Sequence, residues 1–429
     1  MPDSTPRQPS IPIPERYFRI EDRFERPARQ RPQAGTISEL AEWLTGPARK
    51  IERLAELFDE YAWRLVAAGI PAMRLTAHVG TLHPQFTGFG VQWWRDAGYT
   101  TDTAILHEVR DTPGYLANSI RCCIEFGETI RRRLDGPPDG LDFPVLAELR
   151  AQGGTDYLAL PVEGVRGRRF ALTYVTDRPG GFAERELDDL RRLSDLLAML
   201  LASHGQARIA RNLLGAYLGA RTGERVLDGQ VRRGQGEEIR VVIWSSDLRG
   251  FTERSDRLSG QQTITLLNAF FEAQAQAIAA HDGEILKFMG DGLLAIFTVE
   301  DALFTGHATR SALAAAYEAT AAVRRLVRHP ALAGEPPLQM VVALHLGPVV
   351  YGNIGAADRL DFTVIGPAVN LTSRMEAVGK QREIELITSA AFAAAYDGPL
   401  QSLGPHTLRG LAGAHELFTL PSDGTAESG

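Results

Sequence analysis

The second half of the chain, from about residue 239 to 420, alternates short apolar runs with longer amphipathic segments. Apolar side chains in the longer segments recur every three or four residues, the period of an α-helix, whereas the short runs are typical of buried strands. A chain that alternates strands and helices in this way is expected to form an α/β sandwich with mixed strand order. The predicted helices are 260–280, 308–327 and 368–378, and the predicted strands are 241–244, 284–288, 293–297, 340–345 and 362–365.

Two of the predicted strands end at an aspartate close to glycine. Asp247 follows the first strand, and Gly250 comes three residues later. Asp291 lies between two glycines at the tip of a predicted hairpin. Glycine permits unusual backbone angles and the close approach of a phosphate chain. Mg²⁺ typically takes one or two carboxylates together with substrate phosphates and water. A lone aspartate would be explained as a turn residue, but the pair predicts a site for divalent cations and a triphosphate.

A third segment, 362–374, reads as a strand, a turn and the start of a helix. Asn370 and Arg374 are four residues apart and therefore share one face of that helix. An amide can orient a ribose, and a guanidinium can bind phosphate oxygens as charge develops on them. Taken alone, this segment would be explained by a capping asparagine and a surface arginine.

Taken together, these motifs resemble the class III nucleotidyl cyclases, the adenylyl and guanylyl cyclase superfamily. The resemblance covers about residues 239–420 and implies a ferredoxin-like, palm-type catalytic domain. It rests on four separated segments in the order of the family, which are 246–252, 287–291, 347–355 and 369–374.

The resemblance implies roles for the residues of these motifs. Asp247 and Asp291 would bind two Mg²⁺ or Mn²⁺ ions per active site, and Leu248 would add a backbone carbonyl. One ion would activate the ribose 3′-hydroxyl for attack on the α-phosphate, and the other would hold the triphosphate as pyrophosphate leaves. Asn370 would orient the ribose, and Arg374 would stabilise the transition state.

The active site of the family lies between two catalytic domains in a head-to-tail pair. This chain has one such domain, so the resemblance implies a homodimer with two equivalent sites. Each site would take Asp247 and Asp291 from one chain. The other chain would supply Lys287, Thr363, Asn370 and Arg374.

Lys287 and Thr363 match the positions that select the base. A lysine donor suits N1 of adenine, which is an acceptor, and a threonine hydroxyl can accept a hydrogen bond from the adenine 6-amino group. ATP is therefore the expected substrate and 3′,5′-cyclic AMP the expected product, with guanylate cyclase as the alternative. Threonine resembles the class IIIb subset, several members of which respond to bicarbonate.

Four further residues are candidates for phosphate contacts. Gly250, Phe251 and Thr252 follow the first aspartate, and Arg409 lies near the C-terminal end of the domain. Family members often carry a lysine close to Arg409, where this chain has Leu411. This departure bears on substrate affinity more than on reaction type. A second alternative is a catalytically weak, cyclase-like nucleotide-sensing module. The Gly-Gly-Asp/Glu-Glu-Phe signature of diguanylate cyclases is absent.

The first half of the chain is expected to be regulatory. A helical segment, antiparallel strands and a final helix give residues 37–204 the order of an α+β, GAF-like sensor domain. Whether this domain binds a small molecule or serves as a dimerisation scaffold is open. Trp93, Trp94, Cys122 and Cys123 are explained as core packing rather than as the lining of a pocket. The remaining assignments are a disordered arm at 1–36, a transducer or connector at 205–238 and a flexible tail at 421–429.

Charge and cysteine content limit the remaining classes of function. The net charge of −7 indicates no surface for nucleic acid. No apolar run approaches the ~20 residues that a membrane-spanning helix requires. The only two cysteines are adjacent and cannot build a disulfide framework, which favours a reducing, cytoplasmic setting.

Overall fold

The computed structural model describes residues 13–137, 141–164, 167–326 and 336–421. The chain divides into two compact units, Met1–Ala216 and Tyr217–Gly429. No helix in the described ranges is both long enough and apolar enough to cross a membrane.

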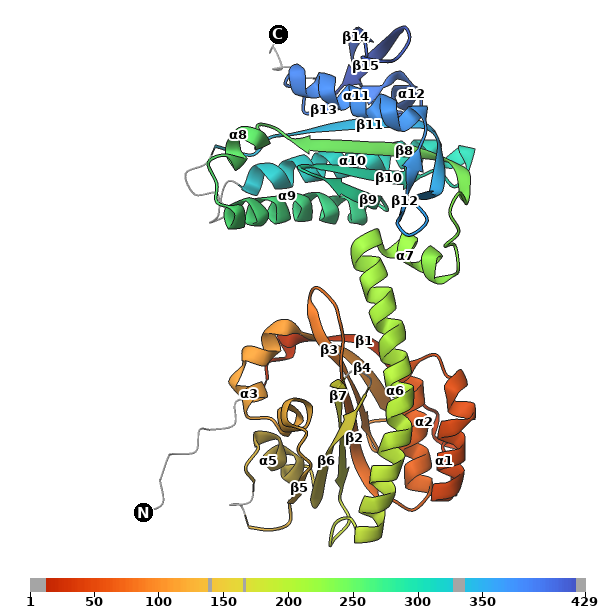
Figure 1. Cartoon of the computed structure of the whole chain (residues 1–429), viewed down its shortest axis with the longest axis vertical. Helices are drawn as coiled ribbons and strands as arrows, with labels where there is room; N and C mark the ends of the chain where they lie inside the picture. The colour runs from red at the N-terminus through yellow and green to blue at the C-terminus, as the bar shows by residue number, and fades with distance from the viewer. Residues whose placement is uncertain (1–12, 138–140, 165–166, 327–335, 422–429) are drawn as a thin grey trace, which may run out of the picture. The chain divides into compact units, whose positions relative to one another are not determined.

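The N-terminal unit is built on an antiparallel seven-stranded sheet with the order β1-β4-β3-β2-β7-β6-β5 (Figure 1). Its strands are β1 (Phe18–Glu25), β2 (Ala72–Gly80), β3 (Phe86–Trp94), β4 (Tyr99–Leu106), β5 (Ile130–Arg133), β6 (Asp156–Glu163) and β7 (Arg169–Thr176). Its α-helices are α1 (Ile37–Thr45), α2 (Leu54–Ala67), α3 (Pro113–Leu116), α4 (Ser119–Arg121), α5 (Pro144–Ala151) and α6 (Glu184–Leu218).

The two faces of this sheet are covered differently. Successive side chains of a strand point to opposite faces, so Phe89 and Val91 of β3 pack into a core with α1, α2 and α6, while Gly88 and Gly90 face the other way. A second, smaller core lies under α4 and α5, around Tyr157. Figure 1 shows α1, α2 and α6 on one side of the sheet and α3 and α5 on the other.

The order of helix, antiparallel strands and helix predicted for this unit is confirmed. The hairpin of β6 and β7 lies where the two apolar runs predicted it. Trp93 and Cys123 are buried in cores, as expected from their chemistry. The structure does not identify the unit as a GAF domain, so that assignment stays a prediction.

Residues 18–25 are a correction to the expected disordered arm. They form β1, which pairs with β4 along its whole length. Arg26 adds ion pairs to Asp59, which is buried, and to Glu60 at 2.6 Å. The sequence showed no strand period because β1 is an edge strand exposed on both faces. Residues 1–12 of the predicted arm and 422–429 of the predicted tail lie outside the described residues.

The C-terminal unit is built on an eight-stranded mixed sheet with the order β14-β15-β13-β11-β8-β10-β9, in which β12 also pairs with β11 (Figure 1). Its strands are β8 (Gly236–Leu248), β9 (Glu284–Met289), β10 (Gly292–Thr298), β11 (Met340–Gly355), β12 (Leu360–Ile365), β13 (Leu386–Ser389), β14 (Gln401–Thr407) and β15 (Ala414–Thr419). Its α-helices are α7 (Ala220–Leu227), α8 (Phe251–Ser255), α9 (Gly260–Ala280), α10 (Thr305–Arg325), α11 (Pro367–Gln381) and α12 (Ala390–Ala393).

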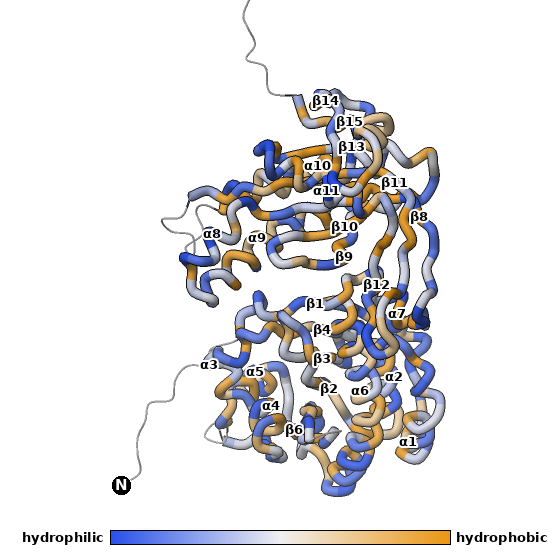
Figure 2. The backbone as a smooth tube through the Cα atoms, turned by 45° about the horizontal axis from the view of Figure 1, so that its top comes forward, coloured by the Kyte–Doolittle hydropathy of each residue, from blue (hydrophilic) through white to orange (hydrophobic). Residues whose placement is uncertain are grey.

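Helices cover both faces of this sheet, which explains why the middle of β8 and almost all of β10 are apolar and buried. Val242 and Trp244 of β8 pack against α9 and α10, while Val241 and Ile243 face the side that carries α11. Six of the seven residues of β10 are buried. Figure 2 shows the resulting concentration of hydrophobic residues along β10 and β11. The predicted α/β sandwich with mixed strand order is confirmed.

The predicted connector at 205–238 consists of the end of α6, helix α7 and the first residues of β8, and its transducer role stays a prediction. Helix α6 contains no proline and continues without a break to Leu218. It ends at Gly219, where φ is 87°. Helix α7 then packs on the sheet of the C-terminal unit, where the Thr222 amide and hydroxyl both donate to buried Glu284, at 3.1 and 2.8 Å. Strand β8 begins at Gly236, still within the predicted connector.

Candidate functional site

The two aspartates meet where β8 ends beside the β9–β10 hairpin. Asp247 pairs with Gly292 in the register of β8 and β10, so it lies next to the hairpin tip. The Leu248 amide donates to the Asp291 carbonyl at 3.2 Å and joins the two segments. A Cβ atom on Gly292 would lie 3.0 Å from the Ser246 carbonyl oxygen, so only glycine fits closely here. The structure therefore brings together the two residues that the sequence singled out.

Successive side chains of β8 point to opposite faces of the sheet, and this determines the direction of the Asp247 side chain. Ser246 points to the α9 face, where its hydroxyl donates to Gln274 at 2.5 Å. Ser245 and Asp247 point to the opposite face, toward α11. The Asp247 carboxylate forms an ion pair with the Lys380 ammonium through Oδ2, while its Oδ1 is buried and has no partner within the described part of the chain.

Burial and charged neighbours set the ionisation of the Asp247 carboxyl group. Burial is the main reason that the pKa of the Asp247 carboxyl is raised to about 6, and Asp291 raises it further while Lys380 lowers it. Burial lowers the pKa of Lys380, but Asp247 and Glu376 more than compensate, so that it lies above its usual range. The contacting carboxyl groups of Asp247 and Asp291 therefore have one positive charge beside them, the Lys380 ammonium. A bound cation can also supply such a charge.

These donors fit magnesium or manganese. The site offers two carboxylates, and one oxygen of Asp247 is unsatisfied among the described residues. Within the described ranges, no group of three or more His, Cys, Asp or Glu side chains is placed to hold a metal ion. A set of two carboxylates suits Mg²⁺, which keeps water and substrate phosphates as its other ligands.

Helix α11 presents two different faces. Glu376 accepts a hydrogen bond from Ser245 and lies 3.5 Å from Lys380, so this face packs on the chain's own β8. Asn370 and Arg374 are both exposed. At a rise of about 1.5 Å per residue, Asn370 lies about 15 Å along the helix from Lys380. The structure therefore places Asn370 away from Asp247 of the same chain.

The two base-selecting candidates lie on neighbouring strands. Lys287 of β9 is half-buried, and Thr363 of β12 is 6% exposed and pairs with Gly352. Strands β9 and β12 are in contact, and their residues Leu286 and Phe362 share one core. The Thr363 hydroxyl has no hydrogen-bond partner among the described residues, so its acceptor capacity is unused within the chain.

Large apolar side chains are left exposed around these candidates. Phe288 and Met289, directly before the hairpin tip, are 53% and 45% exposed. Val350 and Ile365 are cross-strand partners of β11 and β12 and are 42% and 47% exposed. A frame of exposed apolar residues around polar candidates is typical of a protein–protein interface.

The four phosphate candidates lie in two places. Gly250 has φ of 65° and precedes the short helix α8, so it lies with Phe251 and Thr252 just beyond Asp247. Arg409 is exposed in the turn between β14 and β15, an edge hairpin that β13 and β11 separate from β8. Leu411 is half-buried against a small core. The structure does not bring Arg409 to the aspartates of the same chain.

The sequence analysis missed Lys380, Glu376 and Ser245. The Glu376–Lys380 pair has the i,i+4 spacing of a helix ion pair, which is a visible but common signal. Its approach to Asp247 depends on how α11 packs across β8, which no local pattern reveals.

Lys380 is expected to compete with a divalent cation for Asp247. At pH 8, where the carboxyl group is ionised, Lys380→Met should tighten Mn²⁺ binding about two- to fivefold, because a partly exposed ion pair contributes about 0.5–1 kcal/mol. Electron paramagnetic resonance of free Mn²⁺ measures this binding without nucleotide. Arg382→Gln, at the exposed end of the same helix, is the matched control. Weaker binding in Lys380→Met would show that the ammonium helps to shape the site rather than competing for it.

The C-terminal unit is similar in sequence to a known catalytic domain. Residues 235–420 match the family profile described as "Adenylate and Guanylate cyclase catalytic domain". Over 158 residues the chain is 32% identical to Adenylate cyclase 1 of Rhizobium meliloti (strain 1021), a match that covers 36% of this chain and 23% of that protein. The chain thus matches about a quarter of the length of that relative.

Two solved structures are similar to part of the chain. One is the adenylyl cyclase CyaB from P. aeruginosa, with 23% identity, a TM-score of 0.40, and coverage of 44% of this chain and 96% of the other. The second is the guanylyl cyclase Cya2, with 28% identity, a TM-score of 0.39, and coverage of 44% and 97%. Residues 235–420 thus match the catalytic domain shared by adenylate and guanylate cyclases, and they form the mixed α/β sheet unit described above.

Proposed function

We propose that the protein is an adenylate cyclase that converts ATP to 3′,5′-cyclic AMP and pyrophosphate, under the control of its N-terminal unit. The observation that carries this proposal is the pair of carboxyl groups, Asp247 and Asp291, held together with an unsatisfied oxygen at the end of β8. In the reaction, the ribose 3′-oxygen attacks the α-phosphorus, its proton is lost, and the bond to pyrophosphate breaks.

Asp247, Asp291 and the Leu248 carbonyl would hold two divalent ions, Mg²⁺ or Mn²⁺. When bound, such ions lower the pKa of the attacking hydroxyl and neutralise charge on the leaving group. The Arg374 guanidinium would donate hydrogen bonds to the phosphate oxygens as their charge increases, and the Asn370 amide would fix the ribose. Gly250, Phe251, Thr252 and Arg409 remain proposed phosphate contacts.

The proposed active unit is a head-to-tail homodimer. Asn370 and Arg374 are exposed, and Asn370 lies about 15 Å along α11 from Lys380, the ion-pair partner of Asp247. We infer that a second chain brings both residues to the ions. The exposed apolar frame of Phe288, Met289, Val350 and Ile365 supports the same arrangement. Fully burying one such side chain contributes about 1.5–3 kcal/mol, so the frame would stabilise the pair.

Production of cyclic AMP by the purified full-length chain, with Mg²⁺ or Mn²⁺, tests the proposal. Activity with ATP well above that with GTP is expected. A higher rate with GTP would favour guanylate cyclase, for which the family description leaves room. Absence of both activities, with retained nucleotide binding, would favour a catalytically weak nucleotide-sensing module.

Base selection is expected to depend on Lys287 and Thr363. The double substitution Lys287→Glu with Thr363→Cys replaces the donor to adenine N1 by an acceptor that suits the protonated N1 of guanine. We expect the ratio of kcat/KM for ATP to that for GTP to fall about a hundredfold, because mismatched buried polar groups are costly. An unchanged ratio would remove these residues from base recognition. Lys50→Glu, on the surface of the N-terminal unit, is the charge-matched control.

Bicarbonate activation is a further part of the proposal and rests on Thr363 alone. Adding bicarbonate at fixed pH and ionic strength is expected to raise turnover. Unchanged turnover would remove this regulator and leave the cyclase assignment intact.

A further inference from the structure

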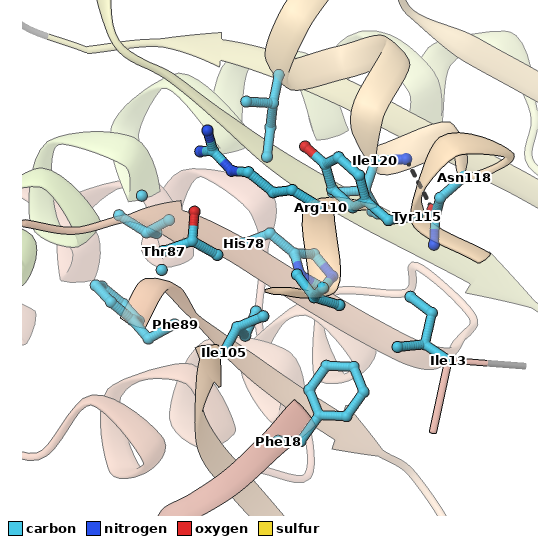
Figure 3. Close-up of a pocket in the computed structure, with 15 residues that line it drawn as sticks. Ile13, Phe18, His78, Thr87, Phe89, Ile105, Arg110, Tyr115, Asn118 and Ile120 are labelled. Atoms are coloured by element: carbon cyan, nitrogen blue, oxygen red, sulfur yellow. Dashed lines mark hydrogen bonds between the residues drawn. The ribbon is translucent and has the colours of Figure 1, made fainter. Parts of the chain in front are cut away.

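The N-terminal unit contains a cavity of about 160 Å³ on the face of its sheet opposite α6. Phe18 of β1, His78 of β2 and Ile105 of β4 form its floor, and Tyr115 and Ile120 lie above them (Figure 3). A second, more polar cavity of about 630 Å³ adjoins it and shares Phe18, His78 and Ile105. No residue of the proposed catalytic site takes part in either.

Two glycines of β3 create this space. On this face the strand presents Gly88 and Gly90, whereas its large side chains point to the helix-covered core. A Cβ atom on Gly88 would lie 2.6 Å from the Val79 carbonyl oxygen, and one on Gly90 would lie 3.4 Å from Nδ1 of His78. Because neither glycine has a side chain, this part of the sheet surface is left uncovered. In a core strand, larger side chains would normally cover it.

The lining selects a type of ligand. Most of the lining side chains are aliphatic or aromatic, and none is acidic. Burial, and secondarily Arg74, lowers the pKa of His78 to about 4, so its ring is neutral at pH 7. Its Nε2 lies 3.1 Å from the Thr76 hydroxyl, and its Nδ1 has no partner in the part of the chain that the structure describes.

Arg110 adds a positive charge at the rim. It is exposed, extends over the cavity in Figure 3, and forms no ion pair within the described ranges. A cavity of about 150 Å³ with an apolar lining accepts one benzene ring. The space thus suits a single ring or a short branched chain, and the guanidinium suits a carboxylate.

We propose that this cavity binds a small monocarboxylate with one ring or a short branched chain as its apolar body. The body lies between Ile105, Phe18 and Ile120, and the carboxylate reaches Arg110. Val79 and Phe89 also line the cavity. Their side chains reach α6, because a Cβ atom added to Gly205 would lie within 4.0 Å of both. A ligand here therefore contacts the strands on which α6 packs.

Isothermal titration of the full-length chain with benzoate and with benzyl alcohol tests the proposal. Benzoate is expected to bind saturably and at least tenfold more tightly than the alcohol. Arg110→Gln should weaken benzoate about tenfold and leave the alcohol unchanged, while Ile105→Phe, which fills the cavity, should abolish the binding of both. Arg185→Gln, an exposed arginine of α6, is the matched control.

Absence of saturable benzoate binding to the wild-type chain would overturn the proposal. Equal affinity for the two probes, or no effect of Arg110→Gln, would overturn the carboxylate assignment. Binding that survives Ile105→Phe would place the ligand elsewhere, and Ile120→Phe serves the same purpose if the first variant fails to fold. These readouts are independent of cyclase activity, so either proposal can fail alone.

Discussion

Asp247→Ala is expected to lower cyclase turnover about a thousandfold or more. The carboxylate is a proposed ligand of the divalent ions, whose stabilisation of the transition state contributes several kcal/mol, and each ~1.4 kcal/mol corresponds to a factor of ten in rate. Cyclic AMP formation at saturating ATP and Mn²⁺ measures the change. Asp247→Asn should behave similarly, because it keeps the size of the side chain but removes the charge.

The fold should survive this substitution. Asp247 carries a buried oxygen without a partner and a pKa raised mainly by burial, so it is not placed there for stability. We expect a Tm close to that of the wild type. Asp397→Ala, an exposed carboxylate paired with Arg310, is the control for loss of charge elsewhere in the unit. Full activity of Asp247→Ala would show that the metal assignment is wrong.

Mixing Asp247→Ala chains with Arg374→Ala chains is expected to restore activity that neither has alone. In a head-to-tail dimer each site takes its aspartates from one chain and its Asn370 and Arg374 from the other. A mixed dimer then has one site with both defects and one intact site. Random exchange should recover about a quarter of the wild-type activity per chain, since about half the dimers are mixed and each has one working site.

The pairing of variants makes this test specific. Asp247→Ala mixed with Asp291→Ala should recover nothing, because both defects fall on the same side of the interface and every site lacks a carboxylate. Asn370→Ala mixed with Arg374→Ala should fail for the same reason. Recovery in either of these mixtures, or none in the first, would contradict the proposed division of the site between two chains.

The helices and strands of the catalytic domain were largely predictable. The helix predicted at 260–280 has the bounds of α9, because its apolar period agrees with a capping box in which Ser259 and Gln262 satisfy the first free amides. The hairpin carrying Asp291 was visible because two apolar runs flank a Gly-Asp-Gly turn. The spacing of apolar residues was sufficient to predict these elements because the residues that it marks as apolar are also the ones that the tertiary structure buries.

The edge strand β1 was not predictable in the same way. Its side chains are largely exposed on both faces, so the apolar alternation that marks a strand is missing. What holds it is pairing with β4 and an ion pair between Asp22 and Arg53, residues distant in sequence. The charged composition that suggested disorder is thus explained by a solvated edge.

The sequence by itself determined the chemistry of the aspartates, the amide and the guanidinium, since their residue types and spacing are fixed by the motifs. Only the tertiary structure decided that Lys380 reaches Asp247, that Asn370 lies far along α11 from this ion pair, and that glycines leave a cavity on the N-terminal sheet. Contacts of this kind depend on how a helix packs across a sheet and which face a strand presents. Those are long-range properties, and a pattern of neighbouring residues does not contain them.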